Sequence, residues 1–274
     1  DQSINHLRGK KVTIYPDFPN GGAIDISNYN DGLRGGKIRL RAKINKHDNK
    51  TLIVTEIPYG TTTTLIDSIL KANDKGKIKI KKIEDNTAAK AEVVIHLAPG
   101  VSPDKTMDAL YAFTDCEVSI SPNSSVIDGD KPRFMGASEI LKVNTDTTVD
   151  LLKKELEIRM DELERQWHFS TLEKIFINEE MYIDFKNYSD KSTLYEYLHK
   201  AFKPFEKKLI REIVEEDLHR LTQIPMIRIT RFDADKADDS IAKIEAEMLE
   251  IKEKLANLIE YSIVYFKDLK KKFG

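Results

Sequence analysis

The side chains best suited to chemistry in this sequence are cations that alternate along one short stretch. "KIRLRAKI", residues 37–44, places Lys37, Arg39, Arg41 and Lys43 on one side and apolar residues on the other. This period of two predicts a half-buried strand with a basic outer face. Side chains two residues apart on a strand face lie about 7 Å from each other, comparable with the phosphate spacing along one nucleic-acid strand. Such a strand can hold a polyanion backbone, which gives affinity and position without reading base sequence.

The distribution of charge along the chain is consistent with a polyanion partner. Residues 1–82 carry 16 Lys and Arg against 8 Asp and Glu, whereas the remaining residues carry 28 against 38. Lys77, Lys79 and Lys81 repeat the alternation on a second predicted strand, which favours a nucleic-acid surface. The plainer alternative is that these lysines only keep the surface solvated.

The sequence contains no arrangement typical of a catalytic, metal or nucleotide site. Most carboxylates fall in helical charge runs, and the six His never take a metal-ligand spacing such as HExxH. The Gly-rich segments lack the Lys-Ser/Thr of a phosphate-binding loop, and no Ser lies in a GxSxG turn. The single Cys116 excludes an internal disulfide and fits a reducing cytoplasm. We therefore predict no catalytic residue, no metal site and no cofactor in this chain.

The basic strand belongs to a predicted α+β domain, residues 1–138, built around an antiparallel sheet. Residues 51–60 follow turn residues and are the expected hairpin partner of residues 37–44. Residues 77–85 and 91–100 are expected to form a second hairpin.

Two helices and a further strand complete this domain. One helix is expected at residues 61–74, where threonines can supply the N-cap, and another at residues 102–114, which begin with Ser and Pro. The strand follows Cys116, and a turn rich in Pro, Gly and Asp closes the domain.

Residues 139–274 are predicted to be helical. Two long helical arms, about 146–177 and 236–271, are expected to pair as an antiparallel coiled coil, with a small globular tip at about 178–235 between them. A parallel coil between two chains through residues 241–269 is the structural alternative. The apolar seam of the last helix takes steps of three and four residues through Ile241, Ile244, Met248, Ile251, Leu255, Leu258, Ser262, Tyr265 and Leu269.

Several stretches, in this order, resemble bacterial type IIA topoisomerase A subunits, meaning those of gyrase and of topoisomerase IV. "YPDFPNGG", "GLRGGKIRLRAKI" and "LIVTEIPYG" are similar to the tower region of that family. "EEDLHRLTQIPMIRIT" resembles the globular end of its coiled coil, and "IEAEMLEIKEKLANLI" is similar to the descending arm. The resemblance covers essentially the whole chain.

The resemblance implies that this chain is part of a larger DNA-cleaving enzyme. In that family the A subunit cuts one DNA duplex with an active-site Tyr and passes a second duplex through the break, while ATP and Mg²⁺ belong to the partner B subunit. Arg directly precedes the catalytic Tyr in the family, and none of the ten Tyr here follows an Arg. We therefore expect a fragment of the breakage-reunion subunit that does not cleave DNA alone and that works with a B subunit in a heterotetramer.

By the resemblance, the Gly-rich loop and the basic strand support the outer arms of the bent, double-stranded DNA segment that is cut. The glycines would let the backbone approach phosphate closely. The family usually has Gln and Lys after "EIPY", whereas this chain has "GTTTT", so no DNA contact is expected at residues 60–64. The expected DNA-binding residues are Arg34, Lys37, Arg39, Arg41 and Lys43.

The resemblance also implies a homodimer contact at the tip, where the lower gate (C-gate) of the family closes. Apolar residues at about 195–230 would be exposed on a lone tip and buried between two copies, although many of them must form the core of the tip itself. The expected dimer contacts are Tyr195, Leu218, Leu221, Ile224, Met226 and Ile227.

A structural coiled-coil scaffold or dimerisation protein with an incidental basic surface is the alternative function. No apolar run approaches the roughly 18 residues of a membrane span, and the polar start is unlike a signal peptide. Together with the resemblance, these observations lead us to expect a cytoplasmic, nucleoid-associated location.

Overall fold

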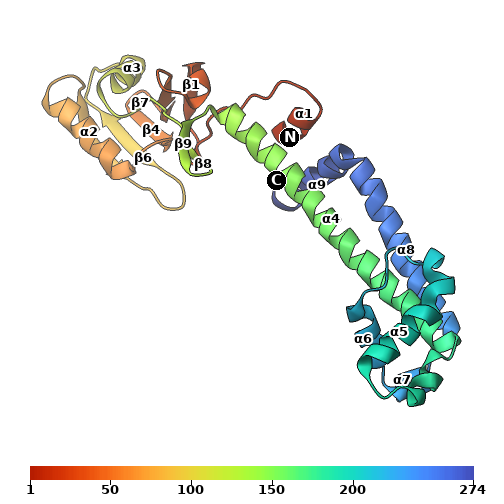
Figure 1. Cartoon of the computed structure of the whole chain (residues 1–274). Helices are drawn as coiled ribbons and strands as arrows, with labels where there is room; N and C mark the ends of the chain where they lie inside the picture. Colours follow the sequence, from red (N-terminus) through yellow and green to blue (C-terminus); the bar gives the residue numbers. More distant parts are fainter. The chain divides into compact units, whose positions relative to one another are not determined.

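The structure, a computed structural model, describes residues 1–274 and divides into two compact units. Residues 2–144 form the sheet unit, and residues 145–274 together with Asp1 form the helical unit. Antiparallel sheets fill the first and long helices the second (Figure 1). This confirms the predicted α+β class.

The strands of the sheet unit are all paired antiparallel. The first sheet has the order β1 (Ala23–Asn28), β2 (Lys37–Arg41) and β7 (Glu117–Ile120). The second has the order β3 (Lys43–Lys46), β4 (Thr51–Glu56), β6 (Val93–Leu97) and β5 (Ile80–Asp85), and β8 (Ser125–Asp128) pairs with β9 (Lys131–Phe134). The helices of this unit are α1 (Gln2–Leu7), the short 3₁₀ helix η1 (Asn30–Gly32), α2 (Thr62–Asp74) and α3 (Pro103–Phe113).

The core of the sheet unit lies between the four-stranded sheet and two helices. Leu52 and Val54 of β4 are fully buried against apolar residues of α2 and α3, among them Leu65, Ile69 and Leu110. Figure 1 shows α2 lying beside β4 and β6. Both helices match their predicted ranges, and Thr61 caps α2 by accepting a hydrogen bond from the Thr64 backbone N–H at 3.2 Å.

The predicted strand 37–44 is divided between the two sheets. β2 ends at Arg41 and β3 begins at Lys43. Ala42, between them, donates its backbone N–H to the Cys116 carbonyl at 2.8 Å, and its own carbonyl accepts from the Tyr111 hydroxyl at 2.9 Å. The predicted hairpin with residues 51–60 is therefore made by β3 alone, because β2 pairs with β1 and β7.

The helical unit is made of helices and short 3₁₀ turns. They are α4 (Ala137–Asn178), which begins in the sheet unit, η2 (Met181–Asn187), α5 (Lys191–Phe202), η3 (Lys203–Lys208), α6 (Glu215–Thr222), α7 (Met226–Thr230), α8 (Ala234–Ala256) and α9 (Leu258–Phe273). In Figure 1, α8 runs beside α4, and α5, α6 and α7 gather near the end of α4.

α4 and α8 pack side by side in opposite directions. Contacts that advance along α4 step back along α8: the Arg159 side chain bonds Glu247 at 2.8 Å, and the Trp167 indole N–H donates to Glu245 at 2.8 Å. Apolar side chains fill the seam, with Leu156 and Leu163 of α4 against Ile244, Met248 and Ile251 of α8.

The seam predicted to continue to Leu269 is interrupted at Asn257. Its backbone lies at φ −119° and ψ 43°, outside the helical region, so α8 ends before it and α9 begins after it. The Asn257 side chain donates to the Glu253 carbonyl at 3.2 Å, a local bond by which Asn competes with the helical ladder. The structure therefore has two helices where one unbroken arm was expected.

The long helix α4 begins at a cap supplied from far away in the sequence. Asp31, in η1, accepts from the Ser138 backbone N–H at 3.1 Å and from the Ser138 hydroxyl at 2.9 Å. A carboxylate at a helix N-terminus satisfies free N–H groups and matches the helix dipole. A Cβ atom on Gly136 would collide with this carboxylate, so the loop and the helix start are fitted to each other.

Asp31→Ala should lower the free energy of unfolding of the sheet unit by about 1–2 kcal/mol, because the cap is lost. Urea unfolding followed by circular dichroism measures the change, and amide hydrogen exchange at residues 138–140 localises it. Asp130→Ala, an exposed carboxylate in the β8–β9 turn, is the matched control. Equal stability of the two variants would contradict a capping role for Asp31.

Candidate nucleic-acid interface

β2 presents the predicted basic face to solvent. Ile38 and Leu40 are 4% and 0% exposed, whereas Lys37, Arg39 and Arg41, which alternate with them, are exposed. The alternation of the strand therefore places three cations on one face of the first sheet. Lys43 is exposed on β3, in the second sheet, and Arg34 is exposed in the loop before β2.

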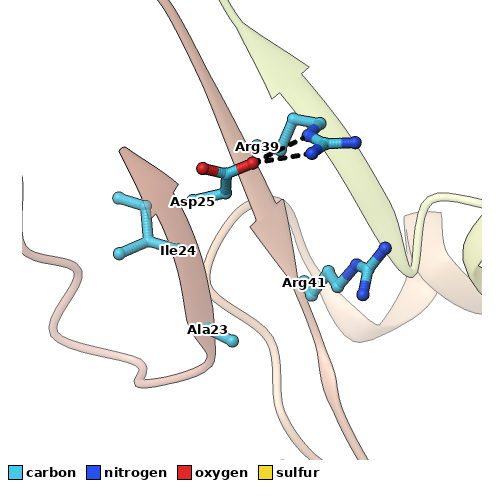
Figure 2. Close-up of a pocket in the computed structure, with 5 residues that line it drawn as sticks. All are labelled: Ala23, Ile24, Asp25, Arg39 and Arg41. Carbon is cyan, nitrogen blue, oxygen red and sulfur yellow. Dashed lines mark hydrogen bonds and ion pairs between the residues drawn. The ribbon is translucent and has the colours of Figure 1, made fainter. Parts of the chain in front are cut away.

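Arg39 is paired with a carboxylate on the neighbouring strand. Asp25 of β1 stands directly opposite Arg39 in the register, and its Oδ2 lies 2.7 Å from one terminal guanidinium nitrogen and 3.2 Å from Nε of Arg39. Figure 2 shows this pair, and both residues line, together with Arg41, a hollow of about 220 Å³. Hydrogen bonds from Ser27, and then from Arg39, hold the pKa of the Asp25 carboxyl well below its usual range.

Arg41 is paired with a carboxylate of β7, the strand on the side of β2 opposite to β1. Glu117 of β7 lies opposite Arg41 in the register and accepts a hydrogen bond from its Nε. The guanidinium carbon also lies 5.0 Å from the centre of the Tyr111 ring, a cation–π distance. Glu117 is the more buried partner, with a side chain 19% exposed against 52% for Arg41.

Lys43 completes the series with Glu56 of β4. The two residues stand opposite each other, and the Lys43 Nζ lies 2.9 Å from Glu56 Oε1. The other oxygen, Glu56 Oε2, accepts from the Gly22 backbone N–H at 2.6 Å. These hydrogen bonds, from Gly22 first and then from Lys43, lower the pKa of the Glu56 carboxyl.

The remaining two predicted cations make no ion pair. Lys37 stands opposite Asn28, which is uncharged, and Arg34 lies in the loop with no carboxylate within salt-bridge distance. Because Arg39, Arg41 and Lys43 each face one carboxylate, the net positive charge of the series lies at the Arg34 and Lys37 end.

The loop glycines approach the protein's own atoms. A Cβ on Gly22, whose φ is +94°, would lie 2.7 Å from the Pro58 ring and 2.8 Å from the Arg41 carbonyl oxygen. A Cβ on Gly36 would collide with the Tyr29 carbonyl. The Gly22 contact brings "PNGG" against "EIPY", and the Gly36 contact brings the end of the loop against Tyr29, so packing within the chain leaves no room for a side chain at either glycine.

The sequence reasoning missed the acidic partners of the basic face. Asp25 lies in "AIDISN", which alternates apolar and polar residues and forms β1, so this signal was available. Glu117 and Glu56 carry no local signal, because each is identified only by the residue opposite it.

The second lysine series is only partly on a strand. β5 begins at Ile80, so Lys77 and Lys79 precede it and Lys81 alone lies within it. Lys77 Nζ lies 5.4 Å from the centre of the Phe113 ring. The predicted repeat of the basic face is therefore not regular.

The predicted dimer residues of the tip fall into two groups. Tyr195, Leu218 and Leu221 are buried in the core of the tip. Met226 and Ile227, at the start of α7, are 62% and 60% exposed. Ile224 is half-buried against the same core.

A cluster of charged and titratable side chains surrounds the buried Asp217 in the helical unit. Asp217 of α6 is 2% exposed and accepts two hydrogen bonds from Arg211, at 2.7 and 2.8 Å, and one from the Val214 N–H at 3.1 Å. The Nε2 of His168, a fully buried residue, lies 3.5 Å from Asp217 Oδ2, and its ring nitrogens make no hydrogen bond. Burial, together with the nearby Arg211 charge, lowers the pKa of His168.

The structure contains no group of three or more His, Cys, Asp or Glu side chains placed to hold a metal ion. None of its helices combines the length and the apolar character that crossing a membrane requires.

Residues 1–270 match the family model for the A subunit of DNA gyrase/topoisomerase IV. The chain is 32% identical over 271 residues to the DNA topoisomerase 4 A subunit of Borreliella burgdorferi, covering 98% of this chain and 43% of that protein. It is 28% identical over 167 residues to the DNA gyrase A subunit of Chlamydia muridarum, covering 56% of this chain and 20% of that protein. It is also 24% identical over 297 residues to the DNA topoisomerase 4 A subunit of Staphylococcus epidermidis, covering 100% of this chain and 35% of that protein. The chain thus spans less than half the length of these relatives.

The buried His168 predicts that the helical unit loses stability in mild acid. Its pKa is lowered in the folded state from an ordinary value near 6.5, so below pH 6.5 the unfolded chain takes up a proton that the folded chain does not. The free energy of unfolding should therefore not depend on the protonation of His168 above pH 6.5. As the pH falls below 6.5, it should decrease by up to about 1.4 kcal/mol per pH unit. The Asp217 pKa is lowered as well, because its hydrogen bonds outweigh its burial, so its own contribution is lost only in stronger acid.

Urea unfolding followed through Trp167, the single Trp, measures this pH dependence. His168→Leu and the more conservative His168→Gln should remove the slope, whereas His199→Gln, at an exposed His in the same unit, should keep it. An unchanged slope in both His168 variants would show that another group titrates.

Proposed function

Since the chain belongs to the family of DNA gyrase/topoisomerase IV A subunits, we propose that it supports the outer arms of a bent DNA duplex through β2 and the loop before it. The whole protein would pass one duplex through a transient break in another. This stretch would contribute DNA binding and dimerisation, and it would not contain the nucleophile that cuts the DNA.

The exposed cations of β2 carry the DNA-binding part of the proposal. Lys37, Arg39 and Arg41 share one face, while Arg34 extends the series into the loop without a competing carboxylate. Cations at this spacing suit a phosphate backbone, and such contacts position DNA without sequence preference.

The exposed pair Met226 and Ile227 supports dimerisation at the tip. Both side chains lie on α7, whose Ile229 is buried in the core of the tip. An apolar pair held in place by a buried neighbour suits a symmetric contact with a second copy. In this proposal Tyr195, Leu218 and Leu221 keep the tip in shape and Ile224 flanks the contact.

A partner polypeptide would supply the ATP-dependent part of the activity. A B subunit would contribute ATP hydrolysis and Mg²⁺ within a heterotetramer, and the DNA partner would place the protein at the nucleoid in the bacterial cytoplasm.

A scaffold with an incidental basic surface is the second candidate. The observation in its favour is that Arg39, Arg41 and Lys43 each face a carboxylate, as expected of a surface stabilised by its own ion pairs.

Arg34→Glu combined with Lys37→Glu should weaken the binding of this chain to a short labelled DNA duplex by about tenfold or more, since two unpaired phosphate-binding cations are reversed. The slope of log affinity against log salt should become shallower by about two. Fluorescence anisotropy at a series of potassium chloride concentrations measures both. Lys71→Glu combined with Lys105→Glu, exposed lysines on α2 and α3, makes the same change in charge and should have a much smaller effect. Equal loss in both double variants, or no binding by the unaltered chain, would favour the scaffold.

Met226→Asp or Ile227→Asp should shift the chain from dimer to monomer, because a carboxylate would be buried without a partner. Sedimentation velocity across a concentration series measures the mass. Leu249→Asp, at a side chain of α8 that is 60% exposed, is the matched control and should leave the mass unchanged. A monomer at every concentration for the unaltered chain would contradict dimerisation through this pair.

A further inference from the structure

We propose that Asp25, Glu117 and Glu56 compete with DNA phosphates for the cations of the basic face, so that DNA binds by exchange of ion pairs. This inference rests on the proposed function and concerns how tightly that surface holds its ligand. The carboxylates act through the cations and are positioning residues.

The pairing follows the strand register. Asp25 is opposite Arg39, Glu117 is opposite Arg41, and Glu56 is opposite Lys43. Directly opposed residues are the closest neighbours on a sheet face. Each of the last three cations of the series therefore faces a carboxylate on a different strand, and a terminal nitrogen of Arg39 also lies 4.0 Å from Glu117.

The cations lie further toward solvent than the carboxylates. Arg39 is 51% exposed and Asp25 38%, and the difference is larger for Arg41 and Glu117. A phosphate arriving from solvent therefore meets the cations first. Arg41 uses only its Nε for Glu117 and makes no hydrogen bond through its terminal nitrogens, whereas Arg39 uses Nε and one terminal nitrogen for Asp25.

Two of the carboxylates keep other donors when their cation leaves. Asp25 Oδ1 accepts from the Ser27 N–H at 3.0 Å and from its hydroxyl at 2.6 Å. Glu56 Oε2 accepts from the Gly22 N–H at 2.6 Å. These bonds keep both groups ionised and hydrogen-bonded, which avoids the penalty of an unsatisfied carboxylate. The exchange is therefore readily reversible.

The exchange of ion pairs predicts that the chain binds DNA with low affinity and that this affinity depends only weakly on salt concentration. Each phosphate that takes a cation leaves behind a carboxylate, which recruits a salt cation and offsets part of the counterion release. Neutralising the carboxylates should therefore tighten binding and steepen the salt dependence.

The test measures DNA binding by the full chain with Asp25→Asn, Glu117→Gln and the double variant. Because exposed ion pairs are weak, each single variant should bind the labelled duplex only about two- to fivefold more tightly and the double variant about tenfold. The slope of log affinity against log salt should become steeper. The amide oxygen that Asp25→Asn introduces can still accept from Ser27, so the turn after β1 is kept, and circular dichroism checks the fold of each variant.

Asp74→Asn, at an exposed carboxylate at the end of α2 that pairs with no cation, is the control for a general change in charge. Equal tightening in this control would overturn the inference. So would unchanged or weaker binding by both carboxylate variants while Arg34→Glu with Lys37→Glu still weakens binding, and that result would leave the proposed function intact. No binding by any of these proteins would reject the proposed function together with the inference.

Discussion

The burial of every second side chain of β2 is the constraint on which the charged surface depends. Ile38 and Leu40 are held inside the sheet unit, so the residues between them must face solvent. A shift of the register by one residue would bury the cations and expose the apolar side chains, which fixes the register firmly. The same register sets Asp25 opposite Arg39 and Glu117 opposite Arg41. Core packing thus determines which charges meet on the surface.

Alternation and caps made part of this structure predictable from the sequence. The period of two in residues 37–44 indicated both the buried and the exposed sides, and the Thr-rich and Ser-Pro starts located α2 and α3. The break at Ala42 was not predictable, because it depends on hydrogen bonds to Cys116 and Tyr111. For the same reason a list of cations overstated the charge of the site: the carboxylates that offset it come from strands distant in sequence.

The helical unit shows a similar limit. The three- and four-residue spacing located α4 and α8, but it also ran across Asn257, where a single side-chain hydrogen bond accompanies the end of one helix and the start of the next. In the tip the helices are short, and composition could not separate Leu218 in the core from Met226 at the surface. The cluster of the buried His168 and Asp217 with the exposed Arg211 joins three segments, a proximity that no local pattern encodes.

The Asp31 cap on α4 has a mechanical consequence. The helix is joined covalently to the sheet unit only through the backbone at Gly136, but its first turn is also bonded to η1 through Ser138. A pulling force along α4 is therefore carried by the peptide chain together with such side-chain bonds, among them the Asp31 carboxylate of η1 and the ion pair between Arg133 of β9 and Glu139. Part of any tension on the helix would thus reach the loop between β1 and β2, which also carries Arg34.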